Sequence, residues 1–429
     1  MRVLILGGYG FIGLEIARRI IAAGHEVTGL GRSANTGRHL LPAARWISAD
    51  IATLNTQDAW RGYLEAVDVV INAAGALQSG LKDDVKAIHH TAIVALVSAC
   101  EAQGVRRFIQ ISAAGATTEA TTEFMRSKAR ADSHLRSSSL DWIILHPGLV
   151  IGPNAYGGTA LIRMIASVPL VQPIVFGDRL VQTVALSDLA DVVLDAVDGD
   201  LPAHSEFDLV EEVAHTLRSL VQQFRAWLGV APARMHIAVP EWLAYGVARV
   251  ADALGYLGWR SPMRTTMMRI LSGNVVGEPE TFRAISSLEL SNLTQTLAKM
   301  PSTLQERWFA RLYLIMPAIV AVLALFWILS GLVAMFKLEE ASAFIEVGSD
   351  SARWAVICGA IVDVGLGGAI LYRPWARSAC WGMAAVTLFY LAVGTTFRPD
   401  LWADPLGPLL KTLPALMLAV TAAVLLEER

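Results

Sequence analysis

The sequence predicts an α/β domain with a doubly wound parallel sheet and a small substrate lobe, followed by an all-α domain of four membrane-spanning helices. Three observations predict this. A short apolar run at residues 3–6 leads through a glycine-rich turn into a helix. Further apolar runs alternate with helical segments, which is typical of parallel strands joined by crossover helices. Four long runs in the last part of the chain contain almost no charge.

Composition limits the class of protein. The 429 residues are 54% hydrophobic and 17% charged, which is too apolar for an ordinary soluble protein. The formal net charge is −3, so we expect no nucleic acid partner. The apolar run at the N-terminus is too short for a signal peptide, so we expect the α/β domain in the cytoplasm. No C-x-x-C pair occurs, so we expect no metal site but buried thiols at Cys100, Cys358 and Cys380.

The glycine-rich turn fits both G-x-G-x-x-G and G-x-x-G-x-x-G. In a Rossmann domain the helix after such a turn presents free backbone N–H groups to a pyrophosphate. We expect Gly7 and Gly10 to supply the tight turn and the close approach of the ligand, and Gly13 to allow the helix to pack on the strand. The sequence therefore predicts dinucleotide binding by Gly7, Gly8, Tyr9, Gly10, Phe11, Ile12 and Gly13.

The residue after the second strand, predicted at 25–30, selects the nicotinamide cofactor. An acidic side chain there would bind the ribose 2′-hydroxyl of NAD(H). This chain has Arg32 instead, and an arginine can pair with a 2′-phosphate. We therefore favour NADP(H) over NAD(H), although Arg32 could also be a solvated loop residue.

Three further strands are predicted at residues 44–50, 66–75 and 105–115. Ligands of such sheets bind beyond the carboxyl ends of the strands, so the residues at these ends are candidates. We expect Asp50 and Ile51 to lie beside the adenine. Small residues after the fourth strand would let the cofactor cross the sheet, and a serine follows the fifth; these are Ala73, Ala74, Gly75 and Ser112.

The segments GGYGFIG, NAAG, GVRRFIQIS and HPGLVIGP, with the Arg32 loop, resemble the short-chain dehydrogenase/reductase superfamily, most closely its extended and atypical branches. The resemblance implies that Ser112 and Lys128 are catalytic, with Lys128 also holding the nicotinamide ribose. It implies that Pro147 and Gly148 approach the nicotinamide, where His146 replaces the usual arginine. The family's catalytic tyrosine corresponds to Phe124.

A phenyl ring has no ionisable proton, so Phe124 cannot perform acid–base catalysis. Three interpretations remain open. The reaction could need no such acid, or the domain could bind a nucleotide without turning it over. Alternatively, another group could supply the proton, and the candidates are His89, His90, His134 and Tyr156.

Residues 205–307 are expected to form the lobe, with helices at 215–228 and 241–257. Residues 270–276 and 299–308 resemble an atypical subgroup related to the nucleotide-binding accessory subunit of respiratory complex I, a resemblance that favours a bound but unreacted cofactor. The apolar helices suit a lipophilic substrate, a membrane contact or plain core packing. At residues 177–190 we expect a strand followed by a helix capped by Ser187 or Asp188.

Four runs, 312–336, 354–372, 379–397 and about 406–426, are each long enough to span a bilayer. Basic loops containing Arg307 and Arg373 alternate with a loop containing Glu339 and Glu346. By the positive-inside rule, a multi-pass protein of a bacterial-type inner membrane with both termini in the cytoplasm is expected. The predicted domains are thus 1–204, 205–307 and 308–429.

Asp363 lies inside the second run, where a carboxylate is costly unless it is neutral or paired. It is a functional candidate or a hydrogen-bonded structural acid. The compact layout of four spans resembles the DoxX-like family, some of whose members are linked to quinone chemistry. The sequence therefore predicts a membrane-bound NAD(P)-dependent oxidoreductase acting on a lipophilic or quinone-like substrate. Its alternatives are a non-catalytic NADP(H) sensor or assembly protein, and a transporter built on the four spans.

Overall fold

The computed structural model describes residues 1–80, 83–345, 349–405 and 407–427. Glu346 and Leu406, which entered the sequence predictions, lie outside the described residues. The chain divides into two compact units. Unit 1 contains Met1–Ala253 and Ser261–Ala310, and unit 2 contains Leu254–Arg260 and Arg311–Arg429. The predicted boundary between residues 307 and 308 falls inside one long helix, α13 (Leu304–Phe336).

Unit 1 is built on a seven-stranded sheet with the order β11-β6-β5-β4-β1-β2-β3, and every pair in it is parallel. This confirms the predicted Rossmann fold. The seventh strand comes from the segment assigned to the lobe and pairs with β6 instead. The strands are β1 (Arg2–Leu6), β2 (Glu26–Gly31), β3 (Arg45–Ser48), β4 (Val69–Asn72), β5 (Arg107–Ile111), β6 (Asp141–Pro147) and β11 (Ser205–Leu209).

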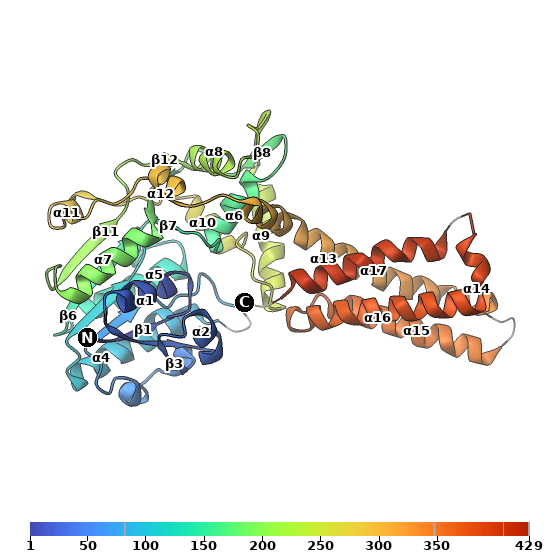
Figure 1. Ribbon diagram of the computed structural model, residues 1–429, viewed down its shortest axis with the longest axis horizontal. Coiled ribbons are helices and arrows are strands. Elements are labelled where there is room, and N and C mark those ends of the chain that lie inside the picture. The colour runs from blue at the N-terminus through green and yellow to red at the C-terminus, as the bar shows by residue number, and fades with distance from the viewer. Residues whose placement is uncertain (81–82, 346–348, 406, 428–429) are drawn as a thin grey trace. The chain divides into compact units, whose positions relative to one another are not determined.

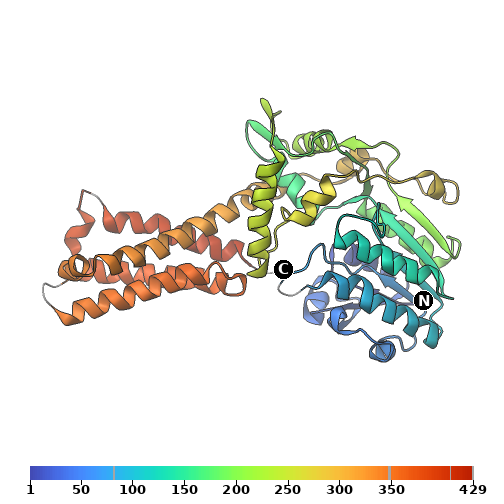
Figure 2. The ribbon, with the colours of Figure 1, turned by 180° about the vertical axis from the view of Figure 1, so that it is seen from behind.

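Helices cover both faces of this sheet because its strands are apolar on both sides. In β1, Val3 and Ile5 join the core under α1 (Phe11–Ala22) and α7 (Leu186–Asp198), seen in front of the sheet in Figure 1. Leu4 and Leu6 join the core under α4 (Ala92–Gln103) and α5 (Glu123–Arg136), seen in Figure 2. Shorter elements are α2 (Ala34–Leu40), α3 (Gln57–Trp60), η1 (Ile51–Thr53), η2 (Arg61–Tyr63) and a π-helical turn, η3 (Ala87–Thr91).

The lobe is assembled from short strands and helices, and the buried carboxylate of Glu211 ties three of its segments together. This group accepts hydrogen bonds from Thr183 N at 2.9 Å, Leu293 N at 2.8 Å and His215 Nε2 at 3.1 Å. The elements are β7 (Leu149–Ile151), β8 (Val171–Ile174), β9 (Leu180–Val181), β10 (Thr183–Ala185), β12 (His215–Thr216), β13 (Met235–Ala238), α6 (Gly157–Ala166), α8 (Leu217–Trp227), α9 (Glu241–Tyr256), α10 (Thr265–Leu271), α11 (Glu280–Arg283) and α12 (Leu293–Lys299).

The predicted cap of α7 is wrong. The cap residue is Ala185, which has no side chain able to cap, and Ser187 and Asp188 lie inside the helix. The Asp188 carboxylate instead accepts a hydrogen bond from Ser291 N at 2.6 Å. Asp188 therefore ties α7 to the segment before α12.

In the described part of unit 2, four helices are long and apolar enough to cross a membrane: α13, α15 (Asp350–Ala369), α16 (Arg373–Phe397) and α17 (Pro408–Leu425). Two shorter elements, α14 (Leu338–Ile345) and η4 (Pro399–Trp402), connect them. Glycine allows close helix contact here, because a Cβ on Gly367 would lie 2.9 Å from the backbone nitrogen of Ile328. The predicted four-helix layout is confirmed.

Asp363 links three of these helices. Its carboxylate accepts hydrogen bonds from Tyr390 OH of α16 at 3.1 Å and from Ser330 Oγ of α13 at 3.3 Å. The side chain is buried. This matches the hydrogen-bonded acid that the sequence offered as the alternative to a functional role, since two hydroxyl donors compensate the carboxyl inside a span.

Candidate dinucleotide-binding site

Two glycines of the turn after β1 are required by the chain itself. Gly7 has φ +68°, and a Cβ there would lie 2.8 Å from Ala74 Cα. A Cβ on Gly13 would lie 2.3 Å from the carbonyl oxygen of Gly7, so α1 packs directly on the turn. These contacts match the tight turn and the helix–strand packing expected of the motif.

Gly10 is the cap residue of α1, and no side chain caps the helix there. Leu14 N donates to Gly10 O at 3.0 Å, and this bond begins the helical ladder. The N–H groups of Phe11, Ile12 and Gly13 precede the ladder, so they are the donors that a helix leaves for an external acceptor. With the positive end of the helix dipole they form a site suited to a pyrophosphate. The residues present therefore fit a dinucleotide.

The aromatic side chains of the turn pack against neighbouring elements. Tyr9 OH accepts a hydrogen bond from Ser33 N at 3.2 Å, and its ring covers Gly31, where a Cβ would lie 2.4 Å from it. Phe11 stacks on Tyr156, with ring centroids 5.9 Å apart and an interplanar angle of 14°. Tyr9 thus fixes the turn against the end of β2, and Phe11 fixes it against the start of α6.

The segments after β2 and β3 carry the residues expected near the adenosine. Arg32 follows β2 and donates to Asp83 Oδ1 at 2.8 Å. Asp50 accepts a hydrogen bond from Ala52 N at 3.1 Å and so caps η1, while Ile51 is buried. All three follow carboxyl ends of the sheet, on the same edge as the glycine turn.

The small residues after β4 lie against the glycine turn. Ala74 is buried beside Gly7, whereas Ala73 is half-buried and Gly75 is exposed. The preceding Asn72 holds this turn, because its Oδ1 accepts from Ala74 N at 3.2 Å. Its amide also donates to Gln110 on β5 at 2.9 Å. A buried hydrogen bond between side chains of β4 and β5 therefore fixes the backbone at the carboxyl ends of these two strands.

Lys128 lies at the carboxyl end of β5. Its Nζ donates to the carbonyl oxygens of Ile111 at 2.8 Å and Ser112 at 3.3 Å, and lies 5.7 Å from the centroid of the Phe124 ring. Burial lowers the pKa of Lys128 to about 8, although the nearby Asp132 raises it. An ammonium has three donors, so one remains beyond these two carbonyls for a ligand.

Ser112 is buried at the same edge, and its hydroxyl donates to Asp132 on α5. Asp132 also faces His146 Nε2 at 3.7 Å, and His146 Nδ1 lies 3.3 Å from Asp208 on β11. Burial lowers the pKa of His146, but hydrogen bonds to Asp132 and Asp208 outweigh burial and raise it to about 9. Ser112 thus belongs to a buried network around a protonated histidine.

His89 is the nearest of the proposed proton donors to Phe124, with their rings 5.4 Å apart. Its Nε2 accepts from Ala76 N at 2.9 Å, so Nδ1 carries the proton and faces Ser127 Oγ at 3.1 Å. Burial and the Lys128 charge lower its pKa to about 3. A neutral imidazole with both nitrogens occupied is a poor acid for a substrate.

Gly148 is also required by packing. A Cβ there would lie 2.5 Å from the carbonyl oxygen of Gln182, and Gly148 N donates to Leu209 O at 3.1 Å. Pro147 O accepts from Ala114 N at 3.0 Å. Both residues therefore stand at the carboxyl ends of β5, β6 and β11, on the edge that carries Lys128.

The structure brings the predicted residues together along one edge of the sheet. The sequence analysis did not identify Asp132, Asp208 or Asn72. Their side chains contact residues of the site, namely Ser112, His146 and Ala74. Asp132 had one usable signal, since it lies four residues after Lys128 and hence on the same face of α5. No feature of the sequence pointed to Asp208, because only the pairing of β11 with β6 brings it next to its partner His146.

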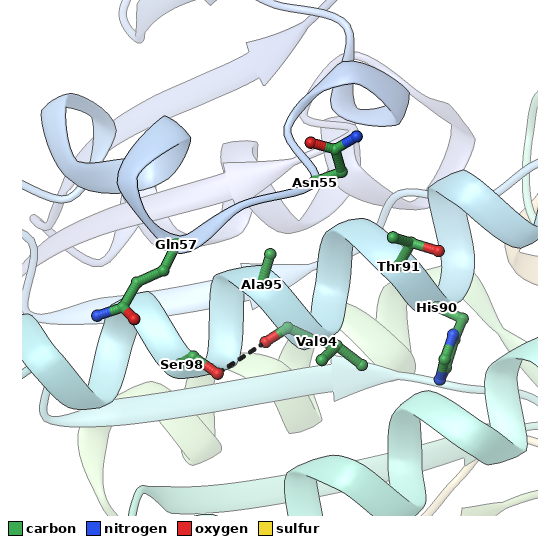
Figure 3. A pocket seen from close by; sticks show the side chains of 7 residues that line it. All are labelled: Asn55, Gln57, His90, Thr91, Val94, Ala95 and Ser98. Atoms are coloured by element: carbon green, nitrogen blue, oxygen red, sulfur yellow. Dashed lines mark hydrogen bonds between the residues drawn. The ribbon is translucent and has the colours of Figure 1, made fainter.

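A cavity of about 280 Å³ opens elsewhere on unit 1, along the outer side of α4 (Figure 3). None of the residues expected to bind the dinucleotide lines it, and His90 is the only proposed proton donor among its lining residues. It is therefore separate from the candidate site. Its lining residues are Asn55, Gln57, His90, Thr91, Val94, Ala95 and Ser98.

The two shifted histidines by themselves give a stability maximum near pH 6.5, the ordinary histidine pKa, and above pH 8 the lowered pKa of Lys128 opposes the alkaline loss. The raised pKa of His146 contributes stability below pH 6.5 that is lost as pH rises through about 9. The lowered pKa of His89 contributes stability above pH 6.5 that is lost as pH falls towards about 3. Each limb is worth roughly 3 to 5 kcal/mol.

Thermal unfolding of the purified protein across this pH range measures both limbs. His146→Gln should flatten the alkaline limb and leave the acid limb, and His89→Gln should do the reverse. A variant that moved both limbs together would contradict the separate assignment.

The fold, the glycine turn after β1 and the N-terminus of α1, which no side chain caps, define a dinucleotide-binding domain of the short-chain dehydrogenase/reductase type. Residues 7–200 match the family described as NAD(P)H-binding, and residues 324–420 match the DoxX-like family. UDP-glucose 4-epimerase of Klebsiella pneumoniae is 31% identical over 126 residues, which are 27% of this chain and 90% of that protein. The chain belongs to this NAD(P)H-binding family and carries a DoxX-like domain after it.

Other relatives are more distant. An uncharacterised chloroplast protein of Arabidopsis thaliana is 25% identical over 199 residues, 45% of this chain and 65% of that protein. This chain thus spans less than two thirds of the length of the first curated relatives it matches. Among solved structures, the Bordetella bronchiseptica enzyme WbmH with NAD+ is 18% identical with a TM-score of 0.53 and covers 70% of this chain and 96% of its own. This last similarity shows the fold alone.

Proposed function

We propose that the protein is a membrane-anchored, NADP(H)-dependent oxidoreductase that acts on a lipophilic or quinone-like acceptor at the cytoplasmic face of a bacterial-type inner membrane. One observation carries the proposal. The uncapped N-terminus of α1, the pyrophosphate site, shares one sheet edge with the buried ammonium of Lys128. The four apolar spans support a substrate drawn from the lipid phase.

The chain's residues have distinct roles in this proposal. A bound nicotinamide supplies or accepts a hydride. The N–H groups of Phe11, Ile12 and Gly13 hold the pyrophosphate, and Asp50 and Ile51 border the adenine. Ala73, Ala74 and Gly75 leave room for the cofactor, and Pro147 and Gly148 border the nicotinamide. Lys128 donates its third N–H to the ribose, and Ser112 orients the edge through Asp132.

A second function is a nucleotide sensor or assembly protein that binds NADP(H) without turnover. Two observations favour it. Phe124 stands where the family's tyrosine would be, and the His89 beside it has both ring nitrogens occupied. The proposed domains keep the bounds 1–204, 205–307 and 308–429, the last as the membrane anchor. However, β11 of the second segment completes the sheet of the first, and β7 to β10 of the first contribute to the lobe.

Purified full-length protein, mixed with NADPH and a panel of quinones, aldehydes and UDP-glucose, separates the two. Loss of nicotinamide absorbance with a quinone or aldehyde, abolished by Lys128→Ala, supports the oxidoreductase. Tight NADPH binding without turnover on the whole panel rejects it in favour of the sensor. Absence of NADPH binding would reject both functions.

Arg32 sets the coenzyme preference in this proposal. Arg32→Ala should weaken NADPH binding by about 10- to 100-fold, the loss of one charge-assisted contact to the 2′-phosphate, and should leave NADH binding nearly unchanged. Calorimetric titration with both coenzymes measures this. Arg38→Ala, on the exposed side of α2, is the matched control. Equal losses for NADPH and NADH would contradict the assignment.

A further inference from the structure

One face of α9 is apolar and exposed although the helix belongs to a folded lobe. Its inner positions are buried alanines, Ala244, Ala248 and Ala251. A neighbouring side, about 100° round the helix from these alanines, presents the exposed α9 face, defined by Trp242, Leu243, Val247, Val250 and Leu254. Leu243, Val247, Val250 and Leu254 follow the spacing of one helical stripe. This arrangement excludes plain core packing as the reason for their apolar character.

The exposure of this face is large. Trp242 is 75% exposed and Val250 is 62% exposed. The helix is nonetheless firmly held to unit 1, because Asp252 pairs with Arg264 at 2.9 Å and accepts from Thr265 Oγ1 at 2.6 Å. A soluble surface rarely keeps so many large apolar side chains together without a partner.

The end of α9 belongs to the membrane unit. Within unit 2, Leu257 O accepts from Arg373 N at 2.9 Å, and Trp259 Nε1 donates to Leu371 O at 2.6 Å. The Arg373 guanidinium lies 5.7 Å from the centroid of the Trp259 ring. These partners form the turn between α15 and α16, so residues 254–260 lie at the ends of two spans.

That turn has the composition of a membrane–water interface. Tyr372 and Trp375 are in edge-to-face contact at 5.4 Å, and Trp375 is exposed. Tryptophan and tyrosine gather at headgroup level, and basic residues such as Arg373 and Arg377 favour the cytoplasmic side. α9 runs directly into residues 254–260, the segment of unit 2 that contacts this turn.

We propose that the exposed α9 face binds the lipid interface as a surface-lying amphipathic segment. Its apolar side chains enter the boundary between headgroups and acyl chains. Trp242 near its start and Tyr256 at its end are both exposed aromatic side chains suited to headgroup level. Arg249, exposed on the same helix, suits the phosphate of the headgroups. The inference concerns lipid contact alone and is independent of the proposed oxidoreductase activity.

A label that senses its surroundings tests this in the full-length protein in phospholipid nanodiscs. The prediction of a buried thiol is wrong for Cys358, which is exposed, whereas Cys100 and Cys380 are buried. Cys358→Ser removes the exposed thiol. A nitrobenzoxadiazole label is then attached at Val250→Cys. The control is Val213→Cys on unit 1, the same residue type with 63% exposure against 62%.

The label at position 250 should emit at shorter wavelength and lose most of its emission when the nanodisc contains doxyl-labelled lipid. The label at position 213 should change in neither respect. Val247→Cys repeats the measurement if the first variant does not fold. Two outcomes overturn the inference: a label at 250 as water-exposed as that at 213, or one shielded from water but unaffected by doxyl lipid, as a covering protein would leave it.

Discussion

Gly10→Asp should weaken dinucleotide binding by about 100-fold or more while leaving unit 1 folded. Gly10 is the cap residue of α1 and has φ −70° and ψ 175°, a conformation that any residue adopts. Aspartate is a preferred cap, and its carboxylate accepts from the first N–H groups of a helix. A cap of this kind adds about 1 kcal/mol to stability. The same carboxylate occupies the donors meant for the pyrophosphate and repels its charge.

Affinity for NADPH should therefore fall by about 100-fold or more, because the negatively charged carboxylate occupies the position of the negatively charged pyrophosphate. The added Cβ would lie 3.0 Å from Gly7 O, a backbone atom that accepts from Gly10 N at 2.8 Å, so this contact offsets part of the gain from capping. Gly10→Asn is the matched control, because it caps the helix without a charge and should lose less affinity. Calorimetric titration and thermal unfolding of both variants measure the two effects. Unchanged binding in Gly10→Asp would remove the pyrophosphate from α1.

The sequence could predict this cradle because a glycine motif reports local backbone geometry. Gly7 and Gly13 are fixed by contacts within the turn and with the strand next to it. The fourth strand was predictable for a similar reason: β4 is buried on both faces and begins with the continuous apolar run Val69–Ile71. The four spans follow from length and lack of charge alone.

The support behind the site could not be predicted, because it depends on partners far apart in the sequence. His146 meets Asp132 and Asp208 only when α5, β6 and β11 are assembled. The capping prediction for α7 failed because Asp188 has a tertiary partner, Ser291, that local pattern cannot reveal. For α9 the sequence left a lipophilic substrate, a membrane contact and core packing open, because apolar side chains occupy both its buried and its exposed positions.

A second large loss of NADPH affinity is expected from changing Lys128, whose buried ammonium is proposed to bind the ribose. Lys128→Met should weaken NADPH binding by about 10- to 100-fold, because a charge-assisted hydrogen bond to the ribose is lost. The wild-type affinity should itself decline above pH 8, because the lowered pKa means that the amine loses its proton there. Lys128→Arg keeps its charge to much higher pH, so its affinity should not decline over the same range.

The stability of the same variants gives an independent test, because the expected direction of its change with pH is known. The folded protein releases the Lys128 proton near pH 8 and the unfolded chain near 10.5. Between these values the unfolded state binds more protons, so the wild type should gain about 3 kcal/mol relative to Lys128→Met as pH rises. His146 is present in both proteins, so its own alkaline loss cancels from the difference. Binding and unfolding measured from pH 6.5 to 10.5 test the two effects together. If the difference in unfolding free energy stayed constant while affinity fell above pH 8, a group other than Lys128 would control binding.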